Sequence, residues 1–255
     1  MARCRFVVPL ILLLASVASA QNPPQSDAQA VFFASQSIAA LTGGNAVNDV
    51  TLTGSVTWSG GAVPETATVT LLASGAGESR MSFVLPSGTR TEIRDSSTGV
   101  AQGKWIAESG KSGLFAYHNC VTDAVWFFPA LGSLAGGPDV VLIYIGQETR
   151  DGAAVQHIQS YIYQPNSSLA QLSTMNFYLD ATTFLPVAIV FNAHPDNNMS
   201  TNMPVEVDFS NYQVLTGIAI PTRIQRSLQG NVLLAVTISN AAFNTGLPLS
   251  DFTIN

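Results

Sequence analysis

The chain has 255 residues, of which 47% are hydrophobic and only 10% are charged, and its formal net charge is −6. Ordinary soluble domains carry roughly 25% charged residues. This acidic, charge-poor composition excludes a basic surface of the size that binds nucleic acid or an anionic membrane.

The first 20 residues have the pattern of a secretory signal peptide. Arg3 and Arg5 precede a nearly continuous apolar run, and Ala18-Ser19-Ala20 forms a small-x-small cleavage site. The apolar run is too short for a membrane span, which takes about 20 residues. We therefore expect residues 1–20 to be removed. The mature chain, 21–255, is expected to be exported to the periplasm or the cell exterior, soluble and without a transmembrane segment.

A single helix is predicted near the start of the mature chain. Ser26 or Asp27 can cap it, and Gly43-Gly44 ends it. Six residues lie close to one face of this helix: Ala28, Val31, Phe32, Ser35, Ile38 and Leu41.

After Gly44 the apolar period changes from 3.6 residues to 2, which is typical of strands. Glycine and proline separate the strands at short intervals, as in an antiparallel meander. In the first half we expect strands over 50–58, 66–73, 81–85, 89–95 and 101–107. In the second half we expect them over 140–146, 153–163, 174–180, 184–193, 205–215, 218–227 and 232–243.

Residues 118–137 form an apolar stretch without strand alternation. Pro129 and Gly132 exclude a long helix there, so we expect a short helix or a packed loop. No repeat and no low-complexity linker interrupts the chain, and we expect one continuous β domain over 21–255.

Candidate catalytic and metal-binding residues are few. His118, His157 and His194 do not have the spacing of a known metal motif, and we predict no metal and no cofactor. Cys120 close to His118 leaves a thiol-dependent enzyme as an alternative. A lone cysteine in an apolar segment more often packs as a small hydrophobic residue, and we predict no catalytic residues and no enzyme activity.

Aromatic residues are the remaining candidates for function. A helix and a long meander close only in part, so their concave face must be covered by apolar side chains or by an apolar ligand. The aromatic residues then belong either to a packed core or to the wall of a ligand cavity, and the sequence leaves both open. The candidates are Phe32, Trp58, Phe83, Trp105, Trp126, Phe127 and Phe128.

Three segments resemble a known family. They are "GQETRDGAAVQHI" (146–158), "YLDATTFLPVAIVF" (178–191) and "VDFSNYQVLTGIAIPTRIQRSLQGNVLLAVTISNAAFN" (207–244). Together with the export signal, the N-terminal helix and the meander, they resemble the lipoprotein-carrier superfamily with its LolA/LolB-like fold. The resemblance implies a mainly β protein with a few helices. Its architecture would be a single antiparallel half-barrel with an N-terminal helix and a short central apolar helix.

The resemblance also implies a hydrophobic concave surface that binds acyl chains or lipidated partners. We therefore expect a binding protein for a lipid-like or lipidated ligand, acting in envelope lipid or lipoprotein trafficking. The alternative is an envelope sensor or adaptor that uses the same fold to bind another protein.

Overall fold

The structure is a computed structural model, and it describes residues 24–75, 77–122, 124–132, 134, 136–165 and 167–254. The predicted signal peptide, residues 1–20, lies outside the described residues. Thirteen strands form one antiparallel sheet. The first wing of the sheet contains β1 (Asp49–Trp58), β2 (Glu65–Ser74), β3 (Glu78–Leu85), β4 (Gly88–Asp95), β5 (Gln102–Ile106) and β6 (Ser112–Leu114).

The second wing contains the other seven strands. They are β7 (Val140–Arg150), β8 (Ala153–Ile162), β9 (Met175–Asp180), β10 (Pro186–Ala193), β11 (Met203–Leu215), β12 (Ile218–Leu228) and β13 (Asn231–Phe243). A short helix, α2 (Leu169–Leu172), lies between β8 and β9.

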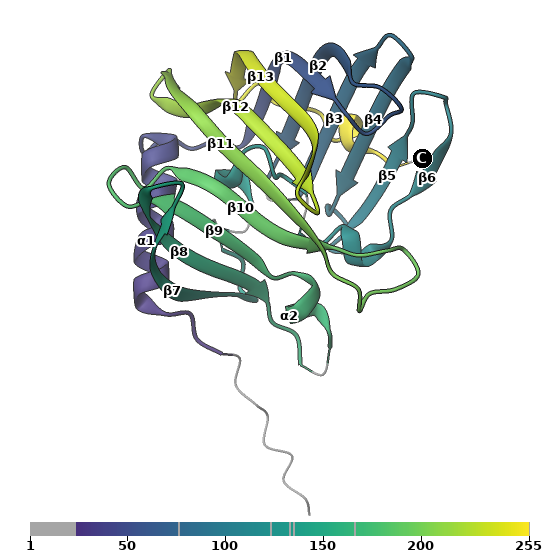
Figure 1. Ribbon diagram of the computed structural model, residues 1–255. Coiled ribbons are helices and arrows are strands. Elements are labelled where there is room, and N and C mark those ends of the chain that lie inside the picture. The colour runs from purple at the N-terminus through teal and green to yellow at the C-terminus, as the bar shows by residue number, and fades with distance from the viewer. Residues whose placement is uncertain are drawn as a thin grey trace, which may run out of the picture.

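The order of the strands is β6-β5-β4-β3-β2-β1-β13-β12-β11-β10-β9-β8-β7. Each wing is a meander, and the two wings meet where the first strand pairs with the last (Figure 1). The sheet curves but stays open, with β6 and β7 at its edges. The predicted mainly β half-barrel is therefore confirmed, and so are the strands that the alternation indicated. The short edge strand β6 is an addition to the strands expected from the sequence.

Tight turns fix the register of the second wing. The hairpins β7–β8, β11–β12 and β12–β13 each turn through a residue with positive φ followed by a glycine. Paired positive φ angles give a turn whose twist matches that of the flanking strands. The turning pairs are Asp151-Gly152, Thr216-Gly217 and Gln229-Gly230.

The segment that connects the two wings crosses the concave face of the sheet. Its described residues include the single-turn 3-10 helices η1 (Tyr117–Asn119) and η2 (Pro129–Leu131), which agrees with the expected short helix or packed loop. Trp126, Phe127 and Phe128 are buried in this segment and belong to the same apolar cluster as the inner residues of both wings. The core therefore lies between the curved sheet and this crossing segment.

The N-terminal helix α1 (Ala28–Thr42) is confirmed, but it buries a different face from the one that the sequence favoured. Ala30, Ala34, Ser37 and Leu41 are the residues turned inward, whereas Phe32 is 53% exposed. The helix packs against β7, β8, β12 and η2. Small alanines at this contact let the helix approach the sheet closely, and the larger Val31 and Phe32 remain outside.

The residues that were expected to cap α1 instead hold the edge of the sheet. Asp27 occupies the N-cap position without a side-chain capping bond. Its carboxylate accepts a hydrogen bond from the Tyr144 backbone N–H at 3.1 Å, and the Ser26 hydroxyl oxygen accepts one from Leu142 N–H at 2.9 Å. Unpaired N–H groups at a sheet edge need partners, and β7 takes them from the chain that leads into α1.

The C-terminal segment covers the outer face of the first wing. The 3-10 helix η4 (Leu249–Phe252) packs on β3 and β4, and Phe252 is only 1% exposed. Arg80 Nη1 donates to the carbonyl oxygen of Asp251 at 3.4 Å. The outer face of β4 is therefore covered by η4. Within the described ranges, no helix has the length and apolar character needed to cross a membrane.

Candidate functional site

A cavity of about 410 Å³ opens on the concave side of the first wing, next to the loop that follows β10. We call it the arginine pocket, because Arg90, Arg94 and Arg226 line it. Much of its remaining wall is apolar or aromatic. This part of the wall contains Trp58, Trp105, Phe115, Phe191, Met203, Leu233 and Leu234.

Strand β4 supplies most of the charge in the arginine pocket. Its charged residues Arg90, Glu92 and Arg94 alternate along the strand and therefore share one face. Thr91 and Ile93 point to the opposite face, where η4 covers the strand. Because that outer face is already covered by η4, the charged face of β4 is the one that meets the cavity.

Arg226 reaches the same cavity from β12. It lies opposite Leu234 of β13, which in turn lies opposite Trp58 of β1. The neighbouring arginine of this strand, Arg223, is three residues away and so faces the outer side. A period of two along β12 accounts for these opposite orientations, but it does not indicate that Arg226 would join the arginines of β4.

Glu92 is the carboxylate between these arginines. Its Oε1 is 3.1 Å from Arg90 Nη2, and its Oε2 is 3.9 Å from Arg226 Nη1. Burial alone would raise the pKa of Glu92. The three arginine charges outweigh burial, with Arg226 the largest of them, and hold this pKa below its ordinary value. Glu92 is therefore ionised at neutral pH and pairs with guanidinium groups from two distant strands.

Each arginine of the pocket lies against an aromatic ring. The Arg90 Cζ is 4.4 Å from the ring centroid of Trp58, and the Arg94 Cζ is 3.6 Å from that of Phe115. Arg226 lies over the ring of Trp126 at 5.4 Å. Such contacts stabilise a guanidinium group and restrict its rotamers. The positive charges of the pocket are consequently held in fixed positions.

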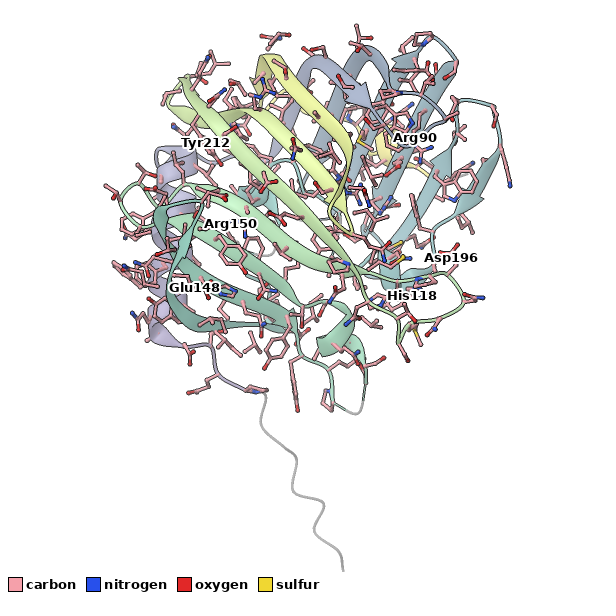
Figure 2. The ribbon with its side chains drawn as sticks, viewed as in Figure 1. Arg90, His118, Glu148, Arg150, Asp196 and Tyr212 are labelled. Atoms are coloured by element: carbon pink, nitrogen blue, oxygen red, sulfur yellow. The ribbon has the colours of Figure 1, made fainter. Side chains whose placement is uncertain are left out.

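The opposite rim of the arginine pocket is tied to the crossing segment. The Asn119 side-chain amide donates to the carbonyl oxygen of His194 at 2.8 Å and accepts from the His194 N–H at 2.9 Å. His118 Nε2 lies 3.2 Å from the Pro195 carbonyl oxygen. Figure 2 shows His118 and Asp196 together at this rim, apart from Arg90. These contacts fix the loop after β10 beside the cavity.

The structure places two of the seven predicted aromatic residues at the arginine pocket. Trp58 and Trp105 line it. Phe83 lies behind Trp58, with ring centroids 5.8 Å apart, and is fully buried. Phe32 lies on the exposed face of α1.

The three aromatic residues of the crossing segment are buried. Trp126 also borders a second, smaller cavity of about 50 Å³ under that segment. Phe127 and Phe128 are fully enclosed in the core. The predicted set is therefore divided between the wall of the pocket, the packed core and the surface.

Cys120 and His118, the residues of the alternative thiol-dependent enzyme, are also buried. Cys120 is 3% exposed, and its Sγ lies 3.5 Å from the carbonyl oxygen of Ala116. His118 is 5% exposed and contacts the Pro195 carbonyl as described above. Across the described part of the chain, no group of three or more His, Cys, Asp or Glu side chains could hold a metal ion.

A second polar cluster lies on the outer face of the second wing (Figure 2). Glu148 Oε1 is 2.6 Å from His157 Nδ1, and the His157 ring stacks on Tyr178 with centroids 4.4 Å apart. Arg150 forms ion pairs with Glu206 and Asp208. These contacts join β7, β8, β9 and β11 across the surface of the sheet, and their role is to hold the strands in register.

The sequence matches no protein-family model and no curated protein sequence. Solved structures share the fold. An outer membrane lipoprotein-sorting protein domain from Vibrio parahaemolyticus superposes with a TM-score of 0.59 at 14% identity, covering 88% of this chain and 96% of that one. A DUF1329 family protein from Desulfovibrio piger gives a TM-score of 0.58 at 12% identity, covering 90% of this chain and 98% of that one.

A LolA superfamily protein from Nitrosomonas europaea gives a TM-score of 0.56 at 11% identity, covering 88% of this chain and 97% of that one. At these identities the similarity concerns the fold. It agrees with the half-barrel built from the strand order above and with the resemblance carried by the sequence segments of the second wing. The protein therefore has a LolA-like fold.

Proposed function

We propose that the protein is an exported, non-enzymatic binding protein that holds a lipid-like ligand in the arginine pocket, at the concave face of the half-barrel. The observation that carries this proposal is the cavity of about 410 Å³ beside an otherwise densely filled core. Ligand pockets commonly have volumes of about 300–1,000 Å³ and mostly apolar walls. The arginine pocket has both properties.

The crossing segment limits where a ligand can be bound. Trp126, Phe127 and Phe128 fill the concave face between the wings, so this part of the half-barrel has no room for a chain. The arginine pocket remains beside that filling, with Trp105, Phe115 and other partly buried side chains in its wall. Each methylene group that a ligand buries there contributes about 0.8 kcal/mol to binding.

Export is supported by the signal-like first 20 residues, and the LolA-like fold is compatible with a role in envelope lipid or lipoprotein trafficking. The burial of Cys120 supports a packing role for that cysteine and a protein without enzyme activity.

The test is a titration with the neutral lipid probe N-phenyl-1-naphthylamine, whose fluorescence rises in an apolar site. The wild-type protein should bind it saturably. Ala193→Phe places a large ring at the wall of the arginine pocket and should weaken binding at least about tenfold. Ala154→Phe is the matched control, since this residue is exposed on β8, and should leave binding unchanged. Absence of saturable binding, or equal binding to both variants, would contradict the proposal.

A further inference from the structure

The aromatic wall of the arginine pocket lies against glycines of the first wing. The Trp105 ring lies over Gly113 of the neighbouring strand β6, where a Cβ would be 2.9 Å from Cζ2 of the ring. The ring of Phe115 has the same relation to Gly103, since a Cβ there would be 2.9 Å from its Cδ2. Because a glycine has no side chain, each ring lies close to the backbone of the sheet, and the space in front of the ring belongs to the cavity.

The volume of the arginine pocket limits the size of its ligand. In a liquid, a water molecule takes up about 30 Å³, and a methylene group is of similar size. A cavity of about 410 Å³ therefore has room for on the order of 14 such groups, which corresponds to one alkyl chain. A lipid with two or three long acyl chains needs a much larger space than this cavity provides.

The crossing segment prevents a ligand from extending into the rest of the concave face. Trp126 is 4% exposed, and Phe127 and Phe128 are fully buried between the wings. The cavity beneath this segment measures about 50 Å³, which is enough for about one or two water molecules but not for a chain. A chain in the arginine pocket consequently ends against packed side chains, and any further methylene groups remain in water.

We infer that the arginine pocket binds amphiphiles with a single alkyl chain of about 14 carbons or fewer and excludes lipids with two or three long chains. This inference rests on the proposed function, because it names the class of ligand bound at that site. The aromatic rings of the wall provide apolar contact along the chain. Trp105 sets the width of the cavity, and Gly113 sets the position of the Trp105 ring.

The experiment measures displacement of N-phenyl-1-naphthylamine by alkyl maltosides, which share one uncharged sugar head and differ only in the length of a single chain. Even-numbered chains from six to eighteen carbons are compared, each below its micelle concentration. We expect each methylene group that enters the cavity to lower the displacing concentration about fourfold. Beyond about 14 carbons the displacing concentration should stop falling, because the additional groups stay in water.

Two variants of the first wing should move this limit in opposite directions. Trp105→Ala removes an indole ring from the wall and should let longer chains continue to gain affinity. Gly113→Ala pushes the Trp105 ring toward the cavity and should end the gain at a shorter chain. Gly137→Ala is the matched control, since a Cβ there makes only an ordinary contact with Val140, and should leave the limit unchanged. Thermal unfolding identifies a variant that fails to fold, and the test then uses the other one.

The outcomes separate the inference from the proposed function. If affinity keeps rising through eighteen carbons, or if no folded variant moves the limit, the inference is wrong and the proposed binding function stands. If the wild-type protein binds neither the probe nor any maltoside, both are wrong.

Discussion

The Glu92 carboxylate lies between guanidinium groups from strands that are more than 100 residues apart in the sequence, and its charge holds them together. Its folded-state pKa is below the ordinary value of 4.5. A carboxyl group of this kind contributes stability above its unfolded pKa, and this contribution is lost as the pH falls through the folded value.

We therefore expect Glu92→Gln to destabilise the protein by about 3 kcal/mol at pH 7, because it removes a buried charge that pairs with Arg90 and Arg226. The difference from the wild type should stay constant above pH about 5 and shrink below that, where the wild-type carboxyl group becomes protonated. Urea unfolding at a series of pH values measures this. Glu78→Gln, at the start of β3, is the control. A difference that does not change with pH would show that the charge of Glu92 is unimportant.

Residue-level reasoning from the sequence named Trp58 and Trp105, which line the pocket, but named neither Phe115 and Phe191 nor any of its charged residues. Arg90, Glu92 and Arg94 alternate in the sequence, a pattern that ordinarily indicates a solvated strand face. Here the residues of the opposite face, Thr91 and Ile93, are buried under η4, about 160 residues later in the chain. The contact between β4 and η4 leaves the charged face toward the cavity. A contact between residues so far apart in the chain cannot be inferred from the local alternation of β4.

The C-terminal end of α1 requires a glycine, for reasons of both backbone conformation and space. Gly43 has φ 59°, and its N–H donates to the Ala39 carbonyl oxygen at 2.9 Å. A Cβ at this position would lie 2.2 Å from the carbonyl oxygen of Gly217, in the turn between β11 and β12. Gly44 also has positive φ, at 80°, but a Cβ there would meet nothing within 4 Å.

This pair of glycines separates backbone strain from steric overlap. Gly44→Ala should cost about 1 kcal/mol, which is the price of a left-handed conformation for alanine. Gly43→Ala should cost at least about 2 kcal/mol more, because the helix must move away from the β11–β12 turn. Thermal or urea unfolding measures both. Equal losses would mean that the contact between α1 and the turn adjusts freely.

The strands were predictable from the sequence, because strand alternation and turn residues such as Asp151-Gly152 depend only on residues that are close together in the chain. The turn at 180–186 is local as well, since Asp180 Oδ1 accepts hydrogen bonds from the N–H groups of Thr182 and Thr183. The orientation of α1 was not predictable. Both of its faces carry apolar residues, and the fit of Ala30 and Ala34 against the sheet decides which is buried.

At the scale of the whole molecule, the single sheet implies that both wings unfold together. Trp58, Trp105 and Trp126 report on the first wing and the crossing segment, whereas far-ultraviolet circular dichroism reports on all strands. We expect the two signals to give one coincident transition, as one domain over 21–255 would require. Two separate transitions would contradict the predicted single domain.

A substitution where β1 pairs with β13 provides a second test of the single unfolding transition. Val236 of β13 pairs with Val56 of β1 and with Ile224 of β12, and it is 2% exposed. Val236→Ala should lower stability by about 2 kcal/mol and shift both signals equally. Val84→Ala, at a position that is 63% exposed, should shift neither.

The pairing of β1 with β13 also has a consequence for biosynthesis. A chain made from its N-terminus completes six strands early, but β13, the second partner of β1, is the last strand to emerge. Until then β1 is an open edge whose backbone can pair with another chain, and its inner residues, such as Val56 and Trp58, are incompletely covered. Delivery of the nascent polypeptide in an unfolded state, with folding after release, would shorten this exposure. A premature stop before β13 should therefore yield an aggregating product rather than a smaller folded protein.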